Sequence, residues 1–296
     1  MKCPICTNSH VKVIGKPGIS NKVRNFIKDD YYVLKCRDCQ FYFIAPPITL
    51  NKDAWIKLYD ENYFGEMTKW WKNRRARERK DRFNRLEKYS NQKIMNFLDI
   101  GCGEGFTLVE ASERGWKAYG VDVSDNRVNS ARGKDIFFKS GDLFNAQFPN
   151  NYFDCIYMDS VLEHVVNPII YLRELKRIMR EGGILYVGVP NEGCLFNDIK
   201  KLLYVLLGKN EISVRIKPFI EPYHVVGFTK KSLITACIQT NFKIVRFRNF
   251  AGLYELLKFR VFSKPFLINL FLVPVHLIAI PIRKQIYFEV ILKKEH

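Results

Sequence analysis

The feature that most constrains the fold is a glycine-rich turn placed directly after a short apolar run. Residues 97–106 read FLDIGCGEGF, so glycines stand at 101, 103 and 105 and a helix-like segment follows. This pattern predicts a β-strand whose C-terminal end turns sharply into a helix, with backbone that can approach a ligand closely. The ligand class that such a turn favours is nucleotide-like.

The spacing of this turn argues against two common phosphate-binding loops. The dinucleotide fingerprint is G-x-G-x-x-G, whereas the sixth position here is Phe106, and no lysine follows as a phosphate loop requires. Asp99 adds a negative charge where a pyrophosphate favours positive potential. Because a carboxylate suits an ammonium group, the turn predicts a ligand in which a nucleoside is joined to an amino acid.

Strand and helix patterns alternate from Ile94 onward. Alternation of this kind predicts a doubly wound α/β fold with a mostly parallel sheet. The expected strands cover 94–100, 117–121, 136–138, 153–158 and 183–189, and the expected helices cover 104–114, 125–132 and 168–180. Residues 242–250 and 285–292 are interpreted as the sixth and seventh strands.

Acidic residues follow several of these strands. In sheets of this class, ligands bind at the carboxyl ends of the strands. The acids expected at that edge are Asp99, Asp122, Asp142 and Asp159. Asp122 lies some twenty residues beyond the glycine turn, the distance at which an acid meets ribose hydroxyls, although a helix N-cap is the alternative. Asp142 suits an adenine amino group, with Leu143 and Phe144 packing on the ring, unless it only stabilises a Gly-Asp turn.

Five separated motifs occur together in one order. They are FLDIGCGEGF, the acid in YGVDVS, GDLF, FDCIYMDSVLEHV and IMREGGILYVGVPN. Over roughly residues 94–250 the chain resembles a class I S-adenosylmethionine-dependent methyltransferase. The resemblance implies a seven-stranded sheet whose last strand is antiparallel. It also implies that Asp99, Gly101, Gly103 and Gly105 form the loop along the methionine part of the cofactor, while Asp122 holds the ribose and Asp142 contacts the adenine.

Candidate catalytic residues follow the fourth strand and lie in a later loop. Glu163 and His164 belong to LEHV, and His224 belongs to EPYHVVGFT. Either histidine suits proton transfer near neutral pH. The alternatives are that Glu163 and His164 orient the loop and that His224 only packs beside a helix start. Asp159, Glu163 and His164 also resemble the divalent-metal set of quinone-precursor O-methyltransferases, although Asp159 stands where a glutamate is usual.

Two C-x-x-C pairs stand near the N-terminus, Cys3 with Cys6 and Cys36 with Cys39, with 29 residues between them. Four thiolates suit a closed, tetrahedral structural zinc site, and four unmetallated thiols are the alternative. Eight cysteines without an N-terminal signal peptide predict a reducing compartment, the cytoplasm, rather than a disulfide framework. We therefore expect a small zinc-ribbon-like unit over 1–47.

The segment 48–93 is interpreted as a linker and a basic helix. Residues 72–82 contain seven basic and two acidic side chains, which fit either a phosphate-binding helix or a solvated one. The formal net charge of +18 favours polyanionic partners such as RNA, anionic lipid headgroups or a phosphorylated substrate. The methyltransferase domain is then expected over 94–296.

Within that domain, residues 265–282 form eighteen residues without a formal charge. A membrane span here would place two neighbouring strands of one sheet on opposite sides of the bilayer, so it is disfavoured. Two interpretations stay open because Pro274 and Pro281 interrupt the run: a buried cover, and a hairpin in peripheral contact with a membrane. Residues 202–207, LLYVLL, extend the same apolar character.

The expected function is methylation of a small or lipid-linked acceptor such as a sugar, a glycan or a quinone-like intermediate, with S-adenosylmethionine and a structural zinc ion as cofactors. An RNA methyltransferase is the first alternative, favoured by the zinc unit, the basic helix and the charge. A noncatalytic binding or scaffold protein is the second.

Overall fold

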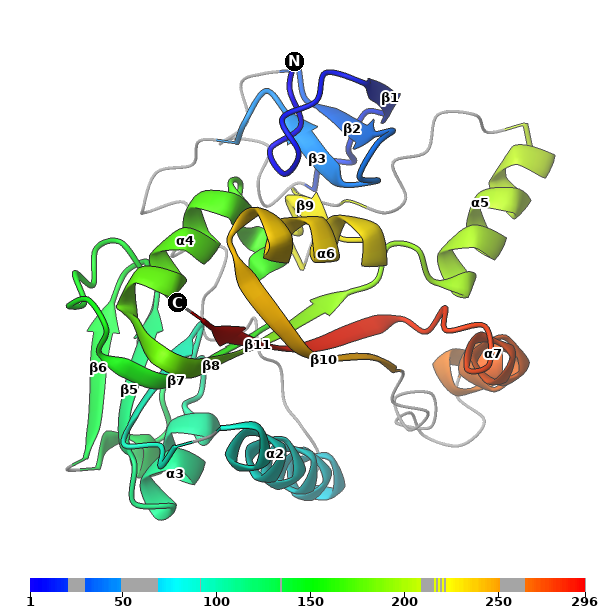
Figure 1. Ribbon diagram of the computed structural model, residues 1–296. Coiled ribbons are helices and arrows are strands. Elements are labelled where there is room, and N and C mark those ends of the chain that lie inside the picture. The colour runs from blue at the N-terminus through cyan, green and yellow to red at the C-terminus, as the bar shows by residue number, and fades with distance from the viewer. Residues whose placement is uncertain are drawn as a thin grey trace.

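The computed structural model describes residues 1–20, 30–48, 69–90, 92–133, 135–208, 216, 218, 220, 222–250 and 264–295. Most of the predicted linker, residues 49–68, lies outside the described residues. The described chain forms a large α/β unit, and a small second sheet lies at its N-terminal end (Figure 1).

The central layer is a seven-stranded sheet, as predicted. Its strands, in spatial order, are β10 (Phe242–Phe250), β11 (Tyr287–Lys294), β8 (Met179–Pro190), β7 (Phe153–Asp159), β4 (Asn96–Ile100), β5 (Lys117–Asp122) and β6 (Ile136–Ser140). Strands β8, β7, β4, β5 and β6 pair in parallel, while β11 runs antiparallel to both of its neighbours. The doubly wound fold with an antiparallel last strand is therefore confirmed.

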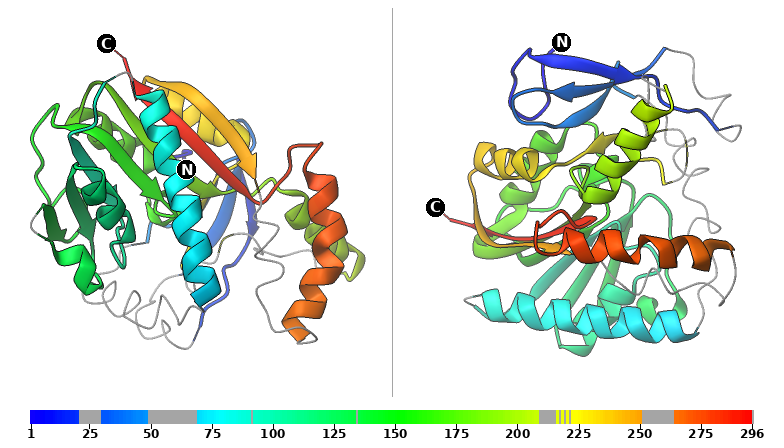
Figure 2. Two further views of the ribbon diagram at one scale, coloured as in Figure 1. Left: turned by 90° about the horizontal axis from the view of Figure 1, so that it is seen from below. Right: turned by 90° about the vertical axis from the view of Figure 1, so that its right-hand side faces the viewer.

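Helices cover both faces of the sheet (Figures 1 and 2). One face carries α4 (Pro168–Ile178) and α6 (Lys230–Gln239), and the other carries α2 (Lys69–Tyr89) and α3 (Phe106–Glu113). Two separate clusters of buried side chains fill the space between the sheet and these two layers. Capping residues explain where α4 and α6 begin. Asn167 accepts a hydrogen bond from the Ile170 amide at the start of α4, and Thr229 forms a capping box with Ser232 at the start of α6.

The prediction of a helix over 125–132 is wrong. Only a short 3-10 turn, Asn129–Arg132, is present in this segment. Asp125 explains the difference, because its carboxylate accepts hydrogen bonds from the backbone N–H and the guanidinium of Arg127 and from the guanidinium of Arg132. These local bonds compete with the helical hydrogen-bond pattern.

The N-terminal unit is a four-stranded antiparallel sheet that the rest of the chain completes. Its strands are β1 (Val11–Gly15), β2 (Tyr32–Cys36), β3 (Tyr42–Ala45) and β9 (Val226–Gly227). β9 pairs with β3 in the register Tyr42 to Gly227 and Phe43 to Val226. The unit is thus hydrogen-bonded to the segment that contains His224.

The basic helix α2 turns three of its arginines inward. Arg79 lies 4.0 Å from Glu110, Arg82 lies 2.5 Å from Asp159 and Arg85 lies 2.5 Å from Glu289. Arg82 and Arg85 attach the helix to the sheet, and Arg79 attaches it to α3, so these arginines are not a solvated row. Arg75 and Arg77, by contrast, are exposed.

The apolar segment 265–282 is mostly helical rather than a hairpin. α7 spans Lys264–Ala279 with Pro274 inside it, and it contacts α5, which spans Leu195–Leu206. Both helices stand beside the sheet, away from α2 and α3 (Figure 2). Among the described residues, no helix combines the length and hydropathy that crossing a bilayer requires.

Candidate active site

The glycine turn forms a tight cradle at the carboxyl end of β4. Gly101, Gly103 and Gly105 have φ angles of 70°, 49° and 77°, the left-handed region that glycine adopts most readily. A Cβ atom on Gly101 would lie 2.5 Å from Val161 Cγ2, and one on Gly105 would lie 2.6 Å from Ala131 Cβ. The turn therefore needs glycine for conformation and for space, as the sequence predicts.

Asp99 lies beneath this turn and is almost completely buried. Its carboxylate accepts a hydrogen bond from the Thr107 hydroxyl. Burial, together with the nearby Asp159 and Asp122, raises the pKa of Asp99 well above its usual range. A cation bound near the turn would favour the ionised form, and an ammonium group fits this requirement.

Asp122 ends β5 and faces the same turn. The Gly103 N–H donates to its Oδ2 at 2.8 Å, and the Ser124 N–H donates to its Oδ1 at 3.3 Å. Burial raises the pKa of Asp122, although these backbone donors oppose the shift. Since the side chain is only partly buried, its carboxylate is oriented by the turn while it still reaches solvent.

Asp142 lies at the carboxyl end of β6, where its Oδ1 accepts from the Asn145 N–H at 2.7 Å. This bond stabilises the Gly-Asp turn, which is the structural role that the sequence left open for Asp142. The side chain is also exposed, and its second carboxylate oxygen is the atom that would contact a ligand. Phe144 is exposed and packs edge-on against Tyr171, whereas Leu143 is fully buried in the core. The adenine contacts of Asp142 and Leu143 stay predictions.

Asp159 ends β7, and other side chains already surround it. It accepts from Arg82 at 2.5 Å, from the Tyr157 hydroxyl at 3.2 Å and from the Tyr287 hydroxyl at 2.7 Å. The structure therefore does not bring Asp159 into the predicted metal set with Glu163 and His164. Sequence reasoning missed Arg82 and Tyr287, because neither is near Asp159 in the chain and neither belongs to a motif.

The three candidate catalytic residues come together although 60 residues separate His164 from His224. The two imidazole rings lie 5.1 Å apart, centroid to centroid, and His224 Nε2 lies 3.8 Å from Glu163 Oε1. His164 Nδ1 lies 3.2 Å from the Tyr223 carbonyl, and burial lowers the pKa of His164 to about 4. At neutral pH, His164 is thus an uncharged ring held by the His224 loop.

The four predicted zinc ligands also gather in one place. Cys3 Sγ lies 3.5 Å from Cys39 Sγ, Cys6 Sγ lies 3.5 Å from Cys36 Sγ, and all four atoms lie within 4.8 Å of one another. Bonds of about 2.3 Å to a tetrahedral ion require sulfur atoms about 3.8 Å apart. The geometry fits a zinc ion, whereas His10 is exposed and lies 3.3 Å from Asp38 instead.

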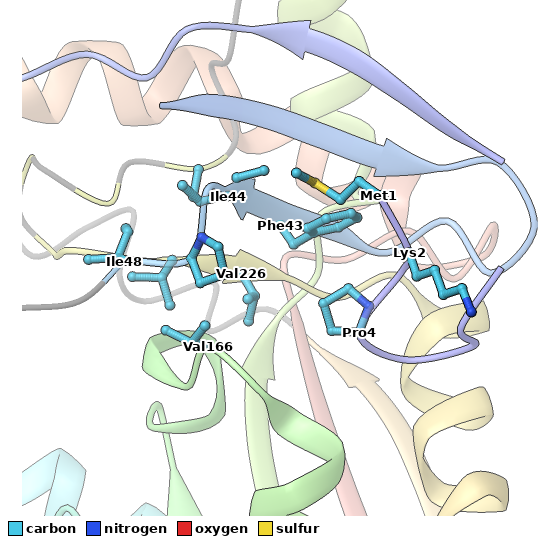
Figure 3. A pocket seen from close by; sticks show the side chains of 11 residues that line it. Met1, Lys2, Pro4, Phe43, Ile44, Ile48, Val166 and Val226 are labelled. Carbon is cyan, nitrogen blue, oxygen red and sulfur yellow. The ribbon is translucent and has the colours of Figure 1, made fainter. Parts of the chain in front are cut away.

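An apolar pocket lies where the N-terminal unit meets the methyltransferase-like part of the chain (Figure 3). One wall carries Met1, Pro4, Phe43 and Ile44, and the other carries residues that follow the two histidines closely in sequence. Those residues are Val166, Val225 and Val226. Its volume of about 110 Å³ suits a small apolar group.

These residues fit the cofactor that the motifs imply. The glycine cradle allows close approach of a ligand, Asp122 offers an oriented carboxylate, and Asp99 is an acid whose charge a cation would stabilise. The chemistry of Asp99, Asp122 and the turn therefore suits a nucleoside that bears an amino-acid group, and their contacts with the cofactor stay predictions.

Comparison with known proteins agrees with this geometry. A family model described as a methyltransferase domain matches residues 70–246. Norajmaline N-methyltransferase of Rauvolfia serpentina is 29% identical over 115 residues, covering 36% of this chain and 39% of that protein. A ubiquinone biosynthesis O-methyltransferase of Parvibaculum lavamentivorans is 26% identical over 103 residues, covering 33% of this chain and 41% of that protein.

A solved structure shares the fold over more of the chain. The crystal structure of a SAM-dependent methyltransferase from Archaeoglobus fulgidus superimposes with a TM-score of 0.51 at 20% identity, covering 80% of this chain and 98% of that one. The matched part of this chain, in contrast, spans only about two fifths of the two curated relatives.

Proposed function

The chain belongs to the methyltransferase domain family, and we propose that it transfers a methyl group from S-adenosylmethionine to a small or lipid-linked acceptor such as a sugar, a glycan or a quinone-like intermediate. The observation that carries the acceptor class is the apolar surface of α5 and α7, which we call the helical face. Its exposed members are Leu202, Leu203, Val205, Leu206, Leu207, Leu270, Leu277 and Ile278.

The helical face is the kind of surface that contacts a lipid-held substrate. Exposed apolar side chains that gather on two contacting helices mark interaction sites, and basic residues beside them favour anionic headgroups. Lys201, next to Leu202 in the sequence, and Arg283, shortly after the end of α7, are exposed, and the chain carries a net charge of +18. We assign the helical face to peripheral contact with a membrane.

Methyl transfer needs few protein groups. The bound cofactor supplies the methyl group on a sulfonium, so the chain has to align the acceptor and exclude water. Gly101 and its neighbours position the methionine part, while Asp122 and Asp142 bind the ribose and the adenine. Glu163, His164 and His224 hold the nucleophilic atom of the acceptor, and the pocket between Phe43 and Val226 accepts a small apolar group.

We assign a structural zinc ion to Cys3, Cys6, Cys36 and Cys39. The four thiols are the closed donor set that zinc prefers, and the ion would fix the N-terminal unit beside the His224 loop through β3 and β9. The zinc unit then acts as one wall of the acceptor site.

The test is transfer of a labelled methyl group from S-adenosylmethionine into a cell extract, followed by separation into lipid, glycan, RNA and small-molecule fractions. Label in the lipid, glycan or small-molecule fraction, absent with Asp122→Ala, would support the proposal. Label confined to RNA would identify the RNA methyltransferase alternative. Absence of label in every fraction, for a protein that binds the cofactor, would remove all of these acceptors.

A further inference from the structure

Glu163 is a buried acid at the proposed acceptor site. It is 1% exposed, and neither carboxylate oxygen has a hydrogen-bond partner in the described part of the chain. A buried carboxylate in this position is costly unless it is neutralised or paired with a positive group. A cation bound beside Glu163 would therefore reduce the free-energy cost of burying its carboxylate.

Two imidazole rings lie beside Glu163, and each offers a nitrogen atom that can bind a metal ion. One nitrogen of His164, one nitrogen of His224 and a carboxylate oxygen of Glu163 lie within 4.8 Å of one another. Because a backbone carbonyl only accepts hydrogen bonds, Nδ1–H of His164 donates to Tyr223 and Nε2 carries the lone pair. This second interaction orients the ring as outer-shell partners orient metal-bound histidines.

The backbone holds these donors in place. The Val225 N–H donates to the Glu163 carbonyl at 2.9 Å, which fixes the His224 loop against the turn after β7. Tyr223, next to His224, is buried and has a φ of 61°, a strained value for a large side chain. Strain of this kind is typical of functional sites, where the surrounding structure maintains it.

The local charge also favours a cation. Asp159 and Glu192 are two further acids in the surroundings of Glu163. The guanidinium of Arg82 is bound to Asp159 at 2.5 Å. A divalent ion beside Glu163 would therefore reduce repulsion among three acids.

We propose that Glu163, His164 and His224 bind a divalent first-row transition-metal ion. Two imidazoles and one carboxylate are a donor set for such ions, and three protein ligands leave coordination positions open. The site differs from the cysteine cluster in donor type and place, and it differs from the set expected from the sequence because His224 replaces Asp159.

Because the same three residues belong to the proposed acceptor site, the open positions would take an oxygen of the acceptor. A bound ion polarises such an oxygen and orients it. This use of the ion rests on the proposed function, whereas the metal site itself does not.

The test measures Mn²⁺ binding to the full chain, because thiolates disfavour this ion and the cysteine cluster then contributes little. Chelator-treated protein is titrated with Mn²⁺, and free ion is followed by its electron paramagnetic resonance signal. We expect one ion per chain for the wild type and for His10→Ala, which removes an exposed histidine elsewhere. Glu163→Gln and His224→Ala should each weaken binding at least tenfold.

Equal Mn²⁺ binding by the wild type and His224→Ala would overturn the proposal, as would the absence of binding by the wild type. His224→Ala decides the result if Glu163→Gln fails to fold, since His224 is only partly buried. Binding of S-adenosylmethionine is measured on the same samples. Retained cofactor binding without Mn²⁺ binding would remove the metal site and leave the methyltransferase function intact.

Discussion

Arg82 on helix α2 lies 2.5 Å from the Asp159 carboxylate at the end of β7, although 77 residues separate the two in the chain. The pair joins the basic helix to the strand end from which the Glu163 turn begins. Asp159 also accepts from Tyr157 and Tyr287, so its charge is compensated by donors from three elements. The basic helix thus positions the candidate site rather than only adding charge to the surface.

Replacing Arg82 by methionine should therefore destabilise the fold. The change leaves a partly buried carboxylate at Asp159 without its cation, and loss of one partner of a buried pair costs about 3 kcal/mol. Urea denaturation measures the free energy of unfolding. Arg77→Met, on an exposed position of the same helix, should change it by less than about 0.5 kcal/mol. Equal effects of the two substitutions would refute the structural role of the Arg82–Asp159 pair.

Gly101→Ala should abolish cofactor binding and lower stability. Its φ of 70° costs an alanine about 1 kcal/mol, and the new Cβ would lie 2.5 Å from Val161 Cγ2, which adds a steric cost. Gly115→Ala is the matched control, because Gly115 has a φ of 76° and nothing lies within 4 Å of a Cβ there.

Calorimetry with S-adenosylmethionine measures cofactor binding by the two alanine variants, and thermal unfolding measures their stability. Both alanines should lower the melting temperature, and only Gly101→Ala should remove binding. Normal affinity in Gly101→Ala would mean that the turn does not contact the cofactor.

The pH dependence of stability should change with Asp99→Asn. Because burial raises the pKa of Asp99 above its ordinary value of 3.8, folding favours the protonated acid. The resulting stability is present below the unfolded-state pKa and is lost as the pH rises toward and through the raised value. Asparagine has no such loss, so the variant should gain stability over the wild type as the pH increases, by at most about 1.4 kcal/mol per pH unit.

Urea denaturation between about pH 5 and pH 8 tests this dependence. Asp135→Asn, on an exposed residue, should follow the wild type at each pH. A constant difference between Asp99→Asn and the wild type would show that Asp99 ionises as readily in the folded chain as in the unfolded one.

The sequence predicted the placement of those residues whose position a local pattern determines. The glycine turn, Asp122 and the cysteine pairs are short-range signals, since each acts within one turn or one strand end. The Arg82–Asp159 pair and the approach of His224 to Glu163 depend on which helix covers which face and on how β9 joins β3. The prediction of a helix over 125–132 failed for a different reason, because hydrogen bonds to the Asp125 side chain outweighed the helix propensity of this segment.

Cys39→Ser should remove the proposed zinc ion. Four thiolates close a tetrahedral site, and binding free energy at such a site contributes directly to folding of the unit. Metal analysis should find about one zinc ion per wild-type chain and much less in the variant, together with a lower melting temperature. Cys237→Ala, in helix α6 and away from the cluster, should keep the full zinc content. Zinc-free wild-type protein with an unchanged melting temperature would refute the structural role of the ion.

Contact with a membrane should depend on the helical face. Leu206 and Leu207 are 73% and 68% exposed, and burying a leucine in an apolar phase contributes about 2 kcal/mol. The double change of both to aspartate should therefore reduce binding to vesicles of phosphatidylcholine and phosphatidylglycerol more than tenfold in a sedimentation assay. Ile238→Asp removes an equally exposed apolar side chain, 64% exposed, from helix α6 on another part of the surface, and it should bind as the wild type does. If both variants lose binding equally, the attraction is general electrostatics and not insertion of the helical face. If neither loses it, α5 does not contact the bilayer.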